Sequence, residues 1–266
     1  MPSFLHRSTF WIPACVYAVL LVSGLWQGLA EASHSQYASP IQLFGSFMNG
    51  TVRLLFPVGV ALVSGSRLAS ELTHRHIANT RTRTGIRTAL GRRLLRVPLQ
   101  VGAAFAVLGL VNAVVALWLL PAIWPDTLDP AGYDLGSAAA VHATDVSVAP
   151  LSGFANGNLV VFTALAALWL GAHAAVFALT TMLAVLLLTH PLVALLVPFM
   201  LYVVESVVFQ LLDLPGASYL ISAVYPTGLQ NYSLWSAVLP FVVLAAAAIA
   251  TATVIVSRAP SNPRLS

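Results

Sequence analysis

Six apolar runs, each long enough for a helix to cross a bilayer, dominate the sequence. Crossing the hydrocarbon core takes roughly 20 apolar residues, and backbone groups in lipid must find hydrogen-bond partners within the segment. The runs lack the alternating pattern of a membrane β-barrel. We therefore predict an all-α polytopic membrane protein, a single transmembrane domain over residues 1–266, with spans at about 9–30, 42–68, 97–120, 158–188, 191–212 and 234–257.

Composition supports this prediction. The chain is 59% hydrophobic and only 8% charged, whereas about 25% of the residues of a soluble domain are charged. All twelve basic residues are arginine, and the absence of lysine is typical of a GC-rich genome, which favours a bacterial source. No nucleic-acid-binding motif accompanies the arginines, so we expect them to contact anionic membrane lipids rather than nucleic acid.

The arginines also predict an orientation. Seven fall between the second and third spans: Arg75, Arg81, Arg83, Arg87, Arg92, Arg93 and Arg96. Short loops rich in Arg stay cytoplasmic, which makes 70–96 a cytoplasmic loop. Loops 31–41 and 121–157 carry no Arg and are expected outside. Both termini then lie in the cytoplasm, and the protein is placed in the cell membrane.

The first run poses two smaller questions. Residues 30–32 resemble a signal-peptide cleavage site, but the apolar run is nearer 20 residues than the roughly 7–15 of a signal peptide. We expect it to remain as the first helix. Cys15, the one cysteine, lies inside this run and is expected to be a small buried hydrophobic side chain.

Residues 64–99 contain a basic amphipathic pattern. Ile86, Leu90, Leu94 and Val97 recur at helical spacing, and the arginines mostly occupy the complementary surface. The pattern predicts a helix that lies at the membrane interface and then turns into the third span. It serves either as a topogenic anchor or as a docking element for a cytoplasmic partner.

The segment 213–233 is apolar in parts, yet Pro215, Gly216, Pro226 and Gly228 interrupt it. We expect a surface loop or short helices that re-enter the outer leaflet, with protein or water covering any non-helical backbone. Tyr219, Tyr225 and Tyr232 are expected at headgroup level.

These features together resemble one family. A small-residue stretch from Gly65 leads to Glu71, a Thr-Arg motif follows at 80–83, a basic helix leads into the third span, and the sequence SAVYPTGL precedes the last. The chain is similar over nearly its whole length to type-2 ATP-binding-cassette (ABC) exporter permeases. The resemblance implies six transmembrane helices, a cytoplasmic coupling helix between helices 2 and 3, and a re-entrant or interfacial segment before helix 6.

The resemblance also implies partners. In this family the ATPase is usually a separate polypeptide, and the loop that carries Glu71, Arg75, Arg81, Arg83 and Arg87 would couple to it. Two ATPase copies and a second permease subunit, identical or similar, complete the transporter. The chain lacks a phosphate-binding loop with its lysine, so the resemblance implies no ATPase activity, cofactor or metal of its own. The expected cargo is an amphipathic or hydrophobic drug, peptide or lipid.

Charged and polar residues inside the spans are costly. Arg53, Glu205 and Gln210 are therefore candidates for a translocation path or a permease–permease interface. The structural alternative has Arg53 snorkelling and Glu205 bound to a neighbouring helix. Asn112, His173 and, on its structural alternative, Gln210 are expected to form interhelical hydrogen bonds. The alternative for the whole chain is a non-transporting scaffold or sensor subunit that recruits a partner through its basic loop. An enzyme is disfavoured, because common nucleophile and metalloprotease motifs are missing.

Overall fold

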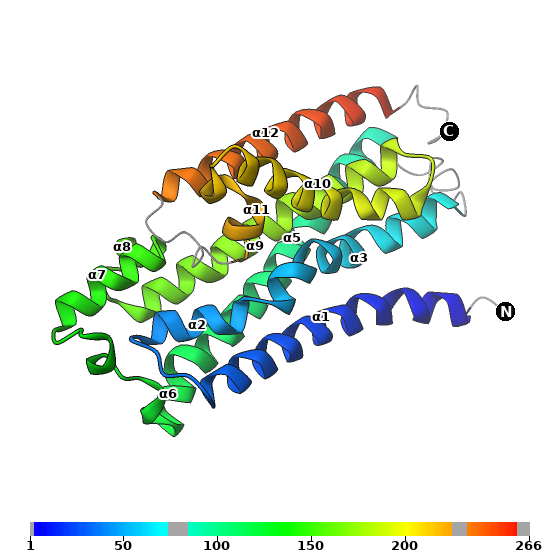
Figure 1. Cartoon of the computed structure of the whole chain (residues 1–266). Coiled ribbons are helices and arrows are strands. Elements are labelled where there is room, and N and C mark those ends of the chain that lie inside the picture. Colours follow the sequence, from blue (N-terminus) through cyan, green and yellow to red (C-terminus); the bar gives the residue numbers. More distant parts are fainter. Residues whose placement is uncertain (1–2, 74–84, 225–232, 260–266) are drawn as a thin grey trace.

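The structure, a computed structural model, describes residues 3–73, 85–224 and 233–259, with side chains left undescribed at 3–10, 67, 69–73 and 191. The described residues are almost entirely helical (Figure 1). The helices are α1 (Ser3–Ala32), α2 (Pro40–Met48), α3 (Thr51–Thr73), α5 (Ile86–Val114), α6 (Leu120–Ile123), α7 (Ala138–Val148), α8 (Leu151–Ala155), α9 (Leu159–Leu187), α10 (Pro191–Leu211), α11 (Tyr219–Ser222) and α12 (Leu234–Arg258). Within these ranges, extended pairing is limited to an isolated bridge between Tyr37 and Leu128.

Five of the described helices are long and apolar enough to cross a membrane. The bent pair α2 and α3 makes a sixth if it counts as one span. The expectation of an all-α, multi-pass membrane protein is thereby supported, and the count of six spans remains a prediction. The longest of these helices runs from Ile86 to Ile123 through a π-helical turn, η1 (Val115–Leu119), that joins α5 to α6.

The second apolar run breaks before its one proline, Pro57. α2 and α3 meet at 52°, and the break lies at Asn49 and Gly50, with Gly50 at φ +66°. A Cβ at Gly50 would also lie 2.3 Å from the amide nitrogen of Gln27 on α1. Pro57 instead lies inside α3, where a distant side chain compensates for its missing N–H, as described below.

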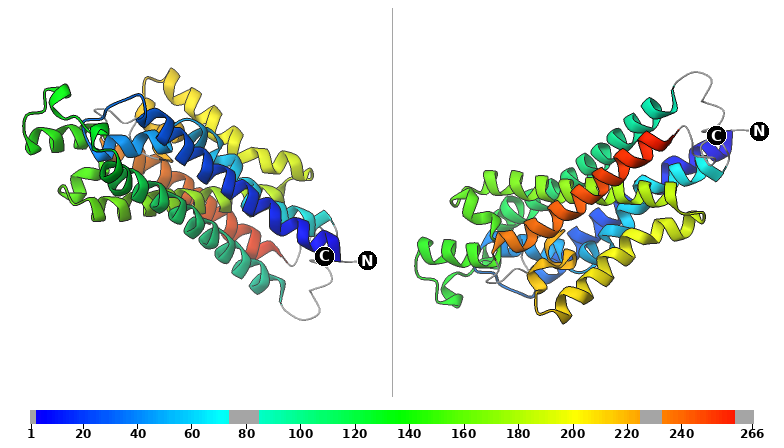
Figure 2. Two further views of the ribbon diagram at one scale, coloured as in Figure 1. Left: turned by 90° about the horizontal axis from the view of Figure 1, so that it is seen from below. Right: turned by 90° about the horizontal axis from the view of Figure 1, so that it is seen from above.

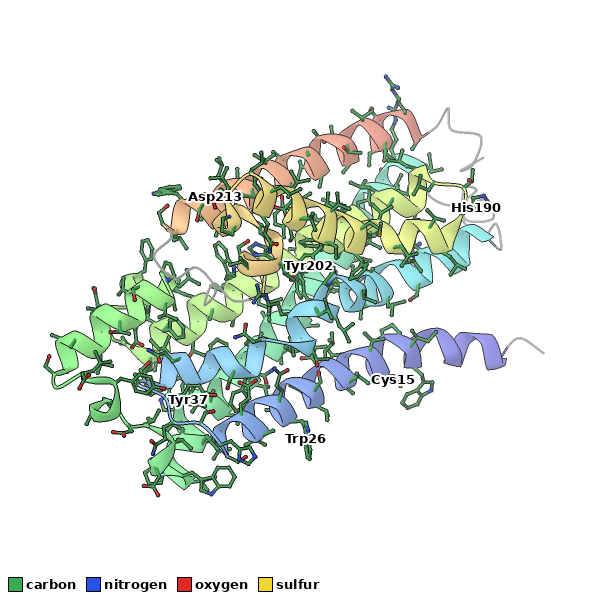
Figure 3. The ribbon with its side chains drawn as sticks, in the orientation of Figure 1. Cys15, Trp26, Tyr37, His190, Tyr202 and Asp213 are labelled. Carbon is green, nitrogen blue, oxygen red and sulfur yellow. The ribbon has the colours of Figure 1, made fainter. Side chains whose placement is uncertain are left out.

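Opposite ends of the bundle differ in charge. Figures 1 and 2 place both termini at one end and α7 and α8 at the other. The turn at His190, between α9 and α10, lies at the same end of the bundle as the two chain termini (Figure 3). The first turns of α5, with their arginines, lie at this end too, whereas the segment at the opposite end carries Asp126, Asp129, Asp134 and Asp145.

α5 and α9 form the most extensive helix pair among the described elements, and small residues permit their close approach. A Cβ built on Gly102 would lie 2.7 Å from the carbonyl oxygen of Gly171, and a Cβ on Gly171 would lie 2.8 Å from the carbonyl oxygen of Gly102. The backbones therefore touch at this crossing, the packing mode of small residues in membrane helices. Buried aromatic rings, including Phe56, Phe105 and Phe177, fill the space where α3 joins this pair.

The basic amphipathic pattern takes a different form from the one expected. Residues 86–97 do not form a separate interfacial helix that turns into the third span, because they are the first turns of the continuous helix α5. Leu90 and Leu94 are buried in a cluster with Met182 and Leu186 of α9. Packing against α9 keeps these turns aligned with the rest of α5.

One further expectation needs correction. Cys15 is exposed on α1 rather than buried, so it faces whatever solvates the bundle. The loop 121–157, expected between two spans, contains α7, α8 and two short 3-10 turns, η2 (Pro125–Thr127) and η3 (Ala131–Tyr133). This segment is fastened to the start of α2. The hydroxyl of Ser39, the N-cap of α2, donates a short hydrogen bond to the Asp145 carboxylate on α7.

Candidate functional site: a polar cluster around α11

α11 is a one-turn helix buried inside the bundle. It follows the 3-10 turn η4 (Pro215–Ala217) after the end of α10, and α12 begins at Leu234. Ser218 and Ser222 at its two ends are fully buried, and Tyr219 is 6% exposed. So short a helix leaves most of its backbone donors and acceptors without intrahelical partners, and in a water-poor interior those groups need partners from elsewhere.

α10 supplies the partners for the amino end of α11. Glu205 Oε2 accepts a hydrogen bond from the Tyr219 N–H at 3.0 Å. Ser206 Oγ accepts one from the Leu220 N–H at 3.2 Å and another from the Ser218 hydroxyl at 2.7 Å. A carboxylate at a helix N-terminus also opposes the partial positive charge of the unpaired N–H groups. Two adjacent residues of α10 thus cap a helix that begins thirteen residues later.

Two other helices supply partners for the carbonyl groups. Arg53 Nε of α3 donates a short hydrogen bond to the Leu220 carbonyl. Trp169 Nε1 of α9 donates to the Ser222 carbonyl at 2.7 Å. A cation near a helix C-terminus is the favourable arrangement. Both ends of α11 are therefore capped by side chains of the charge sign that the helix favours.

Tyr202 extends the cluster into α3. Because Pro57 has no N–H, the carbonyl of Arg53 loses its partner four residues along α3. The hydroxyl of Tyr202 donates to that carbonyl at 2.9 Å, and its side chain is fully buried near the middle of the bundle (Figure 3). Tyr219 adds the last link, since its hydroxyl donates to the Pro240 carbonyl of α12 at 2.8 Å.

The cluster thus joins four long helices through one short one. We use "α11 cluster" for Arg53, Trp169, Tyr202, Glu205, Ser206, Ser218 and Tyr219. Arg53 and Glu205 contact opposite polar groups of α11 rather than each other. One polar atom stays open, because Glu205 Oε1 is buried and lacks a hydrogen-bond partner. The carboxylate is therefore held by one oxygen while the other is unsatisfied.

The structure brings together two of the three intramembrane candidates. Arg53 and Glu205 meet around α11, which matches the structural alternative for Glu205, whereas Gln210 lies exposed on α10 and outside the cluster. Glu71 lies in the last turn of α3, but its side chain is not among those described, and Arg75, Arg81 and Arg83 fall outside the described residues. Arg87 lies in the first turn of α5 and donates to the Ser257 carbonyl at 2.9 Å, which joins α5 to the end of α12.

Sequence reasoning missed other members. Trp169, Tyr202, Ser206 and Ser218 gave no signal, because common residues in apolar runs do not reveal a shared partner. Tyr219 is buried and bonded to α12, and its expected place at headgroup level stays a prediction. Tyr225 and Tyr232 lie outside the described residues.

Two of the expected interhelical polar residues, Asn112 and His173, bond within their own helices. Asn112 Nδ2 donates to the Leu108 carbonyl at 2.9 Å. His173 Nδ1 lies 3.0 Å from the Trp169 carbonyl, and its ring contacts those of Trp169 and Phe241, with centroids 4.7 and 4.4 Å away. Each residue keeps one buried atom without a partner, Asn112 Oδ1 and His173 Nε2. The expectation of interhelical hydrogen bonds was wrong at both positions.

The arrangement links neighbouring helices through backbone and side-chain hydrogen bonds. Among the described residues, no group of three His, Cys, Asp or Glu side chains is placed to hold a metal ion. The hydrogen bonds of the α11 cluster run to backbone groups and hydroxyls of neighbouring helices, so they tie elements together. Comparisons of the chain with protein-family models, curated proteins and solved structures found no match.

Proposed function

We propose that this protein is the membrane-spanning permease subunit of an ABC transporter, driven by ATP hydrolysis on a separate cytoplasmic ATPase. The direction we propose is export of an amphipathic or hydrophobic compound. The observation that carries the proposal is the α11 cluster. A broken helix before the last span, with both ends capped by charged side chains, is a costly feature in a membrane. The cost is easier to understand in a protein whose spans must move together.

Placement of the termini supports the orientation of the proposal. Both chain ends, the α9–α10 turn and the start of α5 lie at one end of the bundle, where the sequence concentrates its arginines. On the proposed topology this end is cytoplasmic, with six spans, both termini inside and the Asp-bearing segment outside. α3 ends and α5 begins there, and we assign ATPase contact to Glu71, Arg75, Arg81, Arg83 and Arg87.

The proposed mechanism is alternating access. Closure of the ATPase would shift the connection between α3 and α5 as a rigid body. Because Arg53 ties α3 to α11 and Glu205 ties α11 to α10, a shift of α3 would be passed to α10 and then to α12. Such coupling requires contacts that differ in free energy between the two nucleotide states. The unpaired Glu205 Oε1 is a group whose environment can change between them.

The experiment is affinity purification of the tagged full chain from its native membranes. We expect it to bring down a protein with a nucleotide-binding phosphate loop whose ATP hydrolysis rises when the complex is reconstituted in lipid. Charge reversal at Arg81 and Arg83 should abolish both. The matched control, charge reversal at Asp126 and Asp129 on the opposite end, should leave both unchanged. Absence of an ATPase from the wild-type preparation contradicts the proposal.

The second candidate is the scaffold or sensor subunit, which the basic end also favours. It needs a partner but no movement of the spans. The two candidates differ in what Arg53→Met does: a transporter loses efflux while keeping its partner, whereas a scaffold keeps all of its recruitment activity. Partner binding and cellular efflux, measured on the same variant, separate them.

A further inference from the structure

The break between α2 and α3 places the carboxyl end of a short helix inside the bundle. In an unbroken helix the Thr51 N–H would pair with the carbonyl of Phe47, four residues earlier. At the break that N–H turns to Gln27 of α1 instead and donates to its Oε1 at 3.2 Å. Phe47 is fully buried, so its carbonyl needs a partner from elsewhere. The last carbonyls of a helix also carry the negative end of its dipole.

A second oxygen approaches the same place from α5. Asn112 is fully buried, its Nδ2 donates to the Leu108 carbonyl at 2.9 Å, and its Oδ1 has no hydrogen-bond partner. Gly24 of α1 marks the place where the two oxygens converge. A Cβ built on Gly24 would lie 3.0 Å from the Phe47 carbonyl oxygen and 3.1 Å from Asn112 Oδ1. Two acceptors, on α2 and α5, therefore approach one point beside α1.

The Asn112 amide cannot satisfy both sides by turning over. Its Nδ2 would then face the Phe47 carbonyl, but its Oδ1 would face the Leu108 carbonyl, to which Nδ2 now donates. In either orientation the amide oxygen lies towards a carbonyl oxygen. Two acceptors repel each other strongly in an interior of low dielectric, so a group of positive charge is needed between them.

The chemistry of the two oxygens favours a small monovalent cation. Both are neutral, one from an amide and one from a backbone carbonyl, whereas calcium and magnesium sites are built with carboxylates. Broken helices in membranes bind Na⁺ with the same kinds of group, unwound carbonyls and the carboxyl ends of half-helices. A methyl carbon of Val52 also lies 3.0 Å from the Cβ built on Gly24, so the place is narrow and suits a bare ion rather than an organic cation.

We propose that Na⁺ binds at the break between α2 and α3, between the Phe47 carbonyl oxygen and Asn112 Oδ1. The ion supplies the positive charge that both oxygens need, and it joins the end of α2 to α5. Gly24 belongs to the site, because a side chain there would occupy the place where the two oxygens converge. Met48, at the same helix end, offers the next backbone oxygen along the chain. This site does not depend on transport or on an ATPase.

The test is the unfolding temperature of the purified full chain in neutral detergent, measured while NaCl replaces choline chloride at constant ionic strength. A ligand of the folded state raises that temperature, so it should rise as Na⁺ replaces choline. Asn112→Leu removes one of the two oxygens and should abolish the rise. Asn112→Asp adds a negative charge to the site and should lower the Kd for Na⁺ by about tenfold or more.

The matched control is Thr181→Val on α9, which removes a fully buried hydroxyl that also bonds to its own helix. Its response to Na⁺ should equal that of the wild type. The wild-type titration decides even if Asn112→Leu fails to fold. Equal unfolding temperatures in NaCl and choline chloride overturn the proposal and would leave water as the donor between the oxygens. A Na⁺ response that persists in folded Asn112→Leu also overturns it, because the ion would then bind elsewhere.

Discussion

The α5–α9 crossing and the α11 cluster hold helices together by opposite means. At the crossing, two glycines let backbones touch, and the neighbouring residues are apolar. Around α11, two charged side chains, a hydroxyl and an indole from three helices satisfy a short stretch of backbone. The crossing is expected to resist change because its atoms cannot move aside. The cluster is expected to undock once one cap is lost, and a part that can undock is suited to movement.

The largest effect is expected at the crossing. Gly102→Ala places a methyl group 2.7 Å from a backbone oxygen, and neither backbone can yield by changing a rotamer. We expect a loss of about 3 kcal/mol in the free energy of unfolding, at the upper end of overpacking costs. The matched control is Gly91→Ala on the same helix, where the nearest atom lies 3.9 Å away, and a gain of about 0.5–1 kcal/mol is expected. Unfolding in mixed micelles measures both, and equal effects would refute close backbone contact.

Removal of one cap of α11 should come next. Glu205→Leu leaves the buried Tyr219 N–H without its acceptor, which costs about 1–3 kcal/mol. Glu205→Gln keeps an oxygen acceptor and should cost less. Gln210→Leu, on the exposed face of the same helix, is the control and should stay within about 0.5 kcal/mol. If Gln210→Leu lowered the free energy of unfolding as much as Glu205→Leu, the hydrogen bond from Tyr219 to Glu205 would not explain the loss.

The effects of removing the two charged caps on the free energy of unfolding should also be non-additive. If loss of either cap undocks α11, the double variant Arg53→Met with Glu205→Leu should cost less than the two single variants together, by about 0.5–3 kcal/mol. A double-mutant cycle on the free energy of unfolding measures this coupling. Strict additivity would mean that Arg53 and Glu205 stabilise separate structures, and the mechanical link proposed through α11 would fail.

A smaller effect is expected at the Trp169 cap. Trp169→Phe removes the donor to the Ser222 carbonyl and keeps most of the ring, so a loss of about 1 kcal/mol is expected. Phe241 stacks on the same ring, and Phe241→Leu reports the packing contribution alone. Hydrogen exchange at the amides of α11 should rise for Trp169→Phe and stay near wild type for Phe241→Leu.

The smallest effect is expected from the pH dependence of the Asp145 carboxyl on α7. Burial raises the pKa of the Asp145 carboxyl above its usual value, although the hydrogen bond from Ser39 and the nearby His142 act the other way. The folded state then holds its proton to higher pH than the unfolded state does, so this group makes stability fall as pH rises from about 3.9 through the raised pKa. Asp145→Asn should flatten that part of a plot of unfolding temperature against pH. An unchanged slope would assign the pH dependence to another group.

Much of the fold could be predicted from the sequence, because apolar length is a local property. The long helices of the described residues overlap the six expected runs, and even the turn at His190 follows from a proline that begins α10. The break in the second run could not be located, because Pro57 is tolerated through the distant Tyr202 hydroxyl. Local sequence signals do not show which distant side chain supplies the missing hydrogen-bond partner of a backbone group.

Of the candidate site, only the charged residues and the interrupted segment before α12 could be predicted from the sequence. Arg53 and Glu205 stand out because charge is rare in apolar runs, and the interrupted segment before α12 stands out through Pro215 and Gly216. That these features belong together depends on tertiary contacts between α3, α10 and α11. The position of Cys15 shows the same limit. A helix exposed to lipid and a buried helix have similar composition, so sequence alone did not reveal which face of α1 is covered.

Cysteine labelling of intact cells tests the central claim, that the arginine-rich end and the Asp-bearing end lie on opposite sides of the membrane with the arginines inside. On a Cys15→Ala background, Ala139→Cys on α7 should react with a membrane-impermeant maleimide. Thr88→Cys on α5 should react only after the cells are permeabilised. Both positions are exposed in the bundle, so access is decided by the membrane. Reaction of Thr88→Cys in intact cells would contradict the account, because the arginine-rich end would then face away from any cytoplasmic ATPase.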